Sequence, residues 1–91
     1  MTRTIKEIKD DITYNIKEHH KEKDEGEYKY NKIMSTARPG FEDMAHKHAM
    51  AQQKICDDSA EFRAQCVERY IDELKQVAPH LCGNYDGWWR R

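Results

Sequence analysis

Large aliphatic side chains, which build most protein interiors, are scarce in this 91-residue chain. Leu, Ile, Val and Phe together account for 13 residues, about 14% of the total. A share below about 20% is typical of disordered chains. Disorder usually also requires a high net charge, however, and the formal net charge is only −1 at pH 7. The composition therefore predicts a folded chain with a small core, which would gain stability from a second copy or a partner.

The chain also lacks recognisable targeting signals and an excess of charge of either sign. No apolar run approaches the length of a membrane span, and the opening MTRTIKEIKDD lacks the apolar stretch of a signal peptide. The three cysteines, an odd number, are more typical of reduced thiols than of a disulfide framework. We therefore expect a cytoplasmic protein without a membrane association.

The first third of the chain has a helical pattern. Thr4 and Glu7 have the spacing of a capping box, in which a hydroxyl caps the helix and a carboxylate follows three residues later. One apolar stripe follows at spacings of three and four: Ile5, Ile8, Ile12, Ile16 and His19. This pattern predicts a helix over 4–23.

A charged segment with Gly26 inside it, HHKEKDEGEYKY, covers 19–30. It favours a break near 23–27 and a second helix over 28–37. Because glycine inside a helix costs only about 1 kcal/mol relative to alanine, one long helix stays open as the alternative.

The second half repeats the helical spacing after a turn at 38–40. One stripe contains Phe41, Met44, His48, Ala51 and Ile55, and a later one contains Phe62, Cys66, Val67, Tyr70, Ile71, Leu74 and Val77. Possible N-caps at 57–59 favour two helices, over 40–56 and 58–78, although a single helix of roughly 38 residues, about 57 Å long, is the alternative. Pro79 should end the helix in both cases.

These elements predict an all-α fold. We expect a small antiparallel bundle of three to four helices over 1–79, followed by a non-helical C-terminal tail over 80–91 and completed by dimerisation. Within the bundle, Ile8, Ile12, Tyr70 and Leu74 should be buried, because they are central on their stripes.

No motif in the sequence indicates catalysis, and we expect neither an enzyme nor a cofactor. The four glycines are too scattered to form a phosphate-binding loop. Histidines and cysteines invite a metal site, but they lack zinc-finger spacing, and only His80 and Cys82 stand close enough to supply two ligands. We therefore expect no metal, with a zinc-stabilised module as the second alternative.

A small nucleic-acid-binding protein is the first alternative. Lys17, Lys21 and Lys23 fall near one side of the first helix. The final WWRR could stack on bases and neutralise phosphates. Acidic residues interrupt every basic run, however, which is more typical of a solvated helix surface.

The C-terminal residues favour protein recognition instead. Five large side chains crowd the last seven positions, as the predicted partner-binding residues: Tyr85, Trp88, Trp89, Arg90 and Arg91. Trp and Arg are enriched among interface hot spots. Because neighbouring side chains on an extended segment point to opposite sides, we expect one tryptophan to pack on the protein and the other to face a partner.

As a type, this small, polar chain without a catalytic motif resembles the accessory proteins that phages and mobile elements carry to modify or block host machinery. The resemblance implies a non-enzymatic helical binding protein that acts as an inhibitor or adaptor of a larger host protein.

Overall fold

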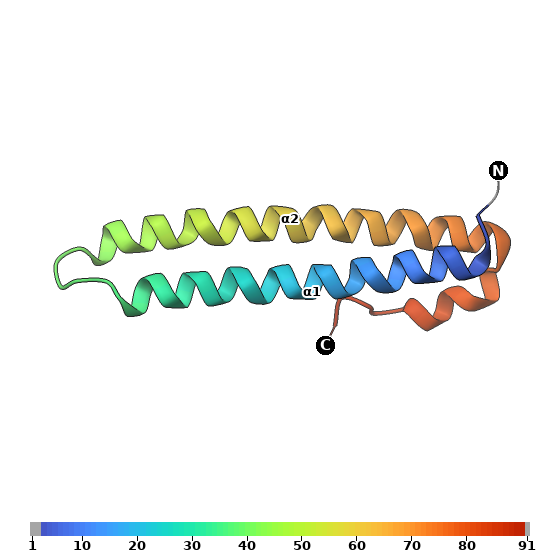
Figure 1. Cartoon of the computed structure of the whole chain (residues 1–91), viewed down its shortest axis with the longest axis horizontal. Helices are drawn as coiled ribbons and strands as arrows, with labels where there is room; N and C mark the ends of the chain where they lie inside the picture. The colour runs from blue at the N-terminus through green and yellow to red at the C-terminus, as the bar shows by residue number, and fades with distance from the viewer. Residues whose placement is uncertain (1–2, 91) are drawn as a thin grey trace.

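The protein is an antiparallel hairpin of two long helices, with a short third helix folded back against one end (Figure 1). The computed structural model describes residues 3–90. Helix α1 spans Ile5–Ser35, helix α2 spans Glu42–Val77, and a 3₁₀ helix, η1, spans Pro79–Tyr85. Every regular element in this part of the chain is helical, which confirms the predicted all-α class. None of its helices is both long and apolar enough to cross a membrane.

Both breaks that the sequence suggested inside the long helices are wrong. Helix α1 continues through the charged segment and Gly26, so the separate helices expected at 4–23 and 28–37 are one element. Helix α2 likewise joins the segments expected at 40–56 and 58–78. Charged residues at these places form ion pairs instead of caps: Lys23 Nζ lies 3.6 Å from Asp57 Oδ1, and Lys54 Nζ lies 3.4 Å from Asp58 Oδ2.

The helix ends follow local chemistry. Thr4 Oγ1 accepts a 3.2 Å hydrogen bond from the backbone N–H of Glu7, as the capping spacing predicted. The turn at 36–41 uses Gly40 at φ 90°, a left-handed conformation that favours glycine. Helix α2 ends just before Pro79, as expected. The tail is not wholly non-helical, however, because residues 80–85 belong to η1.

A seven-residue repeat of buried positions holds the hairpin together. The buried residues of α1 are Ile8, Ile12, Asn15, His19 and Gly26, and those of α2 are Ala49, Cys56, Ala60, Val67 and Leu74. Successive buried residues are three, four or seven positions apart, which is the pattern of a coiled-coil seam. We call this contact the inner seam.

The large side chains of the inner seam gather at one end of the hairpin. Ile8, Ile12, Val67, Leu74 and Ala78 form the core cluster there, and η1 packs against it. Ile8, Ile12 and Leu74 are fully buried as predicted, whereas Tyr70 is only partly buried. Toward the turn at 36–41 the buried residues are small, so the two ends differ in how much apolar surface they bury.

The stripe predicted at 41–55 is not part of this core. Phe41, Met44 and Ile55 are 56%, 68% and 63% exposed, and Phe62 is 59% exposed. They lie on the side of α2 that faces away from α1, since the inner seam occupies different helical positions. The irregular spacing near 62–67 marks the place where apolar residues change from this outer face to the inner seam.

Candidate protein-binding surface

The C-terminal segment folds back over the core end of the hairpin (Figure 1). Helix η1 packs against the core cluster through Leu81, Cys82 and Tyr85. Burial raises the pKa of the Tyr85 hydroxyl, and the nearby groups of Cys82 and Asp10 add to this shift. Tyr85 is thus a supporting residue whose ring holds the segment to the hairpin.

Trp88 anchors the segment to both long helices. Its indole Nε1–H donates a 3.0 Å hydrogen bond to Glu68 Oε1 on α2. On α1, His20 Nε2 lies 3.1 Å from the backbone carbonyl oxygen of Trp88, and the His19 ring meets the indole edge-on with centroids 5.1 Å apart. The side chain is half-buried and packs against the core cluster.

Trp89 has the opposite environment. It is 56% exposed, and its closest ring neighbour is Trp88, at 6.1 Å between centroids. The Arg90 guanidinium carbon lies 5.9 Å from the Trp89 ring centre, within cation–π range. Gly87, at φ 70°, accepts a 2.9 Å bond from the Arg90 N–H and makes the turn that presents this pair. Arg91, also predicted as a partner-binding residue, lies outside the described residues.

A small pocket opens beside the two indoles. Its lining comes from α2 and the C-terminal segment: Glu68, Ile71, Lys75, Cys82, Tyr85, Asp86, Trp88 and Trp89. The walls are aromatic, and the rim carries both a cationic and two anionic side chains. Such a mixture can accept an apolar side chain from a partner and hydrogen-bond the groups around it.

Two features of this surface were missed by the sequence reasoning. Glu68 and His19 belong to it only because α1 and α2 lie side by side. The seven-residue spacing of Ile12, His19 and Gly26 was the available signal for the pairing, since it places all three on one face.

His19 is also part of the inner seam. Its Nδ1 lies 2.8 Å from the backbone carbonyl oxygen of Ala60, so Nδ1 carries the proton and donates. One turn away, Asn15 Oδ1 accepts a 3.1 Å bond from Arg63, and the Asn15 amide donates to the Asp11 carbonyl at 2.8 Å. Buried polar contacts of this kind fix the register of paired helices.

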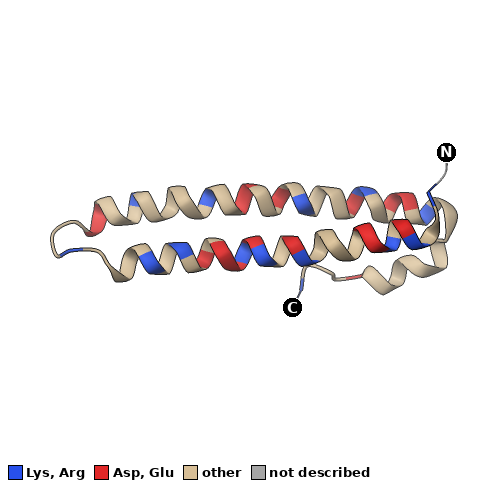
Figure 2. Ribbon diagram, viewed as in Figure 1, with Lys and Arg blue, Asp and Glu red and all other residues tan. Residues whose placement is uncertain are grey.

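The side chains considered above as metal ligands or as nucleic-acid contacts do not gather into a comparable site. Within residues 3–90, no three His, Cys, Asp or Glu side chains are grouped as metal ligands. Acidic and basic residues alternate along both helices (Figure 2). Of the three lysines singled out above, Lys23 forms an ion pair with Asp57.

The chain was compared with protein-family models, curated proteins and solved structures, and none of these matches it. What the chain does must therefore be inferred from its own surface.

Proposed function

We propose that the chain is a non-enzymatic helical binding protein that recognises a larger protein through its C-terminal segment. The exposed Trp89–Arg90 pair, held on an anchored Trp88, is the observation that carries this proposal. An aromatic ring left 56% exposed gains most when a partner covers it. Trp88 already holds the C-terminal segment in place, so binding requires little additional ordering of this segment.

The chemistry of the pair defines the expected contact. Trp89 supplies apolar area, and the Arg90 guanidinium can donate paired hydrogen bonds to a carboxylate of the partner. The pocket beside them offers a place for one apolar side chain of the same partner. Action as an inhibitor or adaptor of a host protein, in the manner of phage accessory proteins, remains a proposal from the type of chain alone.

The test is a capture experiment from the native host with three forms of the full chain. The wild type should retain a specific protein, and a variant with Trp89→Ala and Arg90→Ala should lose it. The matched control is Tyr28→Ala with Lys32→Ala, which removes another exposed aromatic–cation pair, 6.0 Å apart, from the far half of α1. Equal capture by all three forms would refute the proposed surface.

The same capture distinguishes the alternative function. If the retained material is DNA or RNA, released by moderate salt, the chain is a nucleic-acid-binding protein and the protein-binding proposal is wrong. Nuclease treatment before elution separates a direct protein contact from one bridged by nucleic acid.

A further inference from the structure

Helix α2 has a second contact face besides the inner seam. We call it the outer stripe; it contains Phe41, Met44, His48, Ala51, Ile55, Asp58 and Phe62. Successive members are alternately three and four residues apart, which is the spacing of a helix that packs along another helix. All seven are exposed in the hairpin.

The outer stripe covers the half of the hairpin that has the smallest interior. The buried residues of α2 in this half are Ala49, Cys56 and Ala60, and Gly26 lies opposite Cys56 on α1. Large apolar side chains are therefore displayed on the surface where few are buried inside. An exposed and mostly apolar stripe of this kind is typical of an interaction site.

We propose that the outer stripe pairs antiparallel with the outer stripe of a second copy of this chain. The two hairpins would then form a four-helix assembly, with the two α2 helices in the middle and a two-fold axis at the level of residue 53. In this register Met44 lies opposite Phe62 of the second copy, and Ala51 lies opposite Ile55. Met44, Ala51, Ile55 and Phe62 each meet an apolar residue in this register, and the small alanine leaves room for the isoleucine. Phe41 lies opposite Gln65, at the end of the contact.

The polar members of the stripe also match in this register. His48 lies opposite Asp58 of the second copy, a pair that can hydrogen-bond or form an ion pair. At the edge of the stripe, Lys47 lies near Glu61 of the second copy, with opposite charge. Near the axis, the two Lys54 side chains approach each other, but each is within 3.4 Å of Asp58 in its own chain. The pattern is therefore self-complementary, which favours a second copy over an unrelated partner.

The proposed dimer contact, centred at residue 53, and the C-terminal segment lie at different places along α2. The C-terminal segment contacts α2 near Glu68, Ile71 and Lys75, so it lies away from this axis. Dimerisation and the proposed partner binding therefore use different surfaces.

Sedimentation equilibrium of the full chain tests the assembly. At tens of micromolar the wild type should have twice the monomer mass of 10.9 kDa. A variant with Ile55→Asp and Phe62→Asp should be monomeric with unchanged helical circular dichroism, because both residues are exposed in the hairpin. Tyr28→Asp, on the equally exposed Tyr28 of α1, should remain dimeric. A monomeric wild type, or a dimer that persists in the double variant, overturns the proposal.

Carbodiimide cross-linking tests the register. Lys47 and Glu61 are fourteen residues apart on one helix, about 21 Å, so a direct link between them must join two copies. This link should form in the wild-type dimer. Lys47→Glu should weaken the dimer about three- to tenfold, and adding Glu61→Lys should restore it, because the pair is then reversed. A dimer without the link, or without restoration by the second change, overturns the antiparallel register.

Discussion

Trp88 packs edge-on against His19, with ring centroids 5.1 Å apart, although 68 residues separate them in the chain. The same imidazole donates from Nδ1 to the Ala60 carbonyl oxygen in the inner seam. His19 therefore contacts α2 on one side and the C-terminal segment on the other. Trp88 and its neighbour Trp89 should therefore contribute unequally to the free energy of unfolding, and the difference can be measured.

Trp88→Ala should lower the free energy of unfolding by about 2 kcal/mol, less than the loss of a fully buried aromatic because the side chain is half-buried. Trp89→Ala should change it by less than about 0.5 kcal/mol, as for an exposed site. Urea denaturation followed by circular dichroism gives both values. Equal losses of stability would mean that the two indoles share one environment. Trp88 would then not be the residue that anchors the C-terminal segment.

Much of the first half could be predicted from the sequence because its apolar residues are large and regularly spaced. Ile8 and Ile12 identify one face of α1, and both are fully buried. The second half could not be assigned in the same way, since α2 has two faces with helical spacing. The larger residues, including Met44 and Ile55, mark the outer one. Periodicity reveals an apolar face, but it does not show which helix covers it.

The candidate surface was predictable only in part. Aromatic residues near the end of the chain identified the segment, and the expected difference between Trp88 and Trp89 is found in their burial. Glu68 could not be connected to Trp88 in advance, because that contact depends on how the segment returns along α2. Gly26 was interpreted as a helix breaker, whereas it lies at a close approach between the helices.

Gly26→Ala should therefore destabilise the hairpin despite the better helix propensity of alanine. An added Cβ would lie 3.0 Å from the Cys56 Cβ, so the contact must open by a few tenths of an ångström. Overpacking costs about 1–3 kcal/mol, against a propensity gain of about 1 kcal/mol, and a net loss of about 1 kcal/mol is expected. Thermal and urea unfolding of the variant measure it.

Two further variants separate the close approach from a general effect of glycine replacement. Gly83→Ala, where the added Cβ meets nothing within 4 Å, should not be destabilising. Gly26→Ala should cost less in a Cys56→Gly background than in the wild-type background, because the clash is relieved from the other helix. A stabilising Gly26→Ala would show that the helices do not approach closely at this point.

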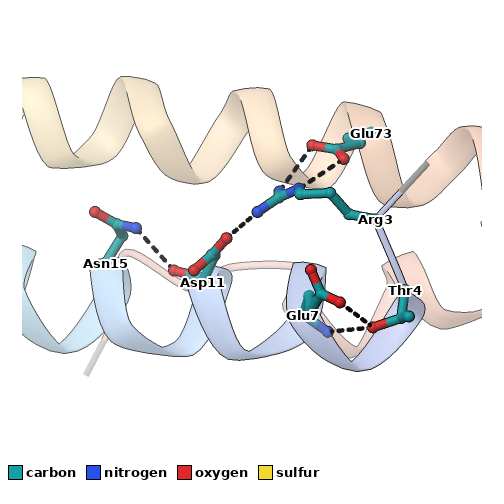
Figure 3. Close-up of polar contacts among 6 residues, drawn as sticks. All are labelled: Arg3, Thr4, Glu7, Asp11, Asn15 and Glu73. Atoms are coloured by element: carbon teal, nitrogen blue, oxygen red, sulfur yellow. Dashed lines mark hydrogen bonds and ion pairs between the residues drawn. The ribbon is translucent and has the colours of Figure 1, made fainter. Parts of the chain in front are cut away.

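The last prediction concerns acid stability and the ion pair that joins the start of the chain to α2. The Arg3 guanidinium donates from Nε and Nη2 to Glu73, at 3.0 and 2.8 Å, and also contacts Asp11 (Figure 3). Its hydrogen bonds to Glu73 lower the pKa of that carboxyl and raise the pKa of Arg3, which stays protonated. Because the folded-state pKa of Glu73 is depressed, its stabilising contribution is complete above the usual glutamate pKa of about 4.3 and is lost as the pH falls through the folded-state value.

Glu73→Gln should therefore be slightly less stable than the wild type at neutral pH, and this difference should shrink in acid. Urea unfolding across pH 3 to 7 measures it, with the exposed Glu27→Gln as the matched control. The pair is partly exposed, so added salt should reduce the same difference. A gap between the wild type and Glu73→Gln that stays constant from neutral pH into acid would show that the carboxylate charge does not stabilise this end of the hairpin.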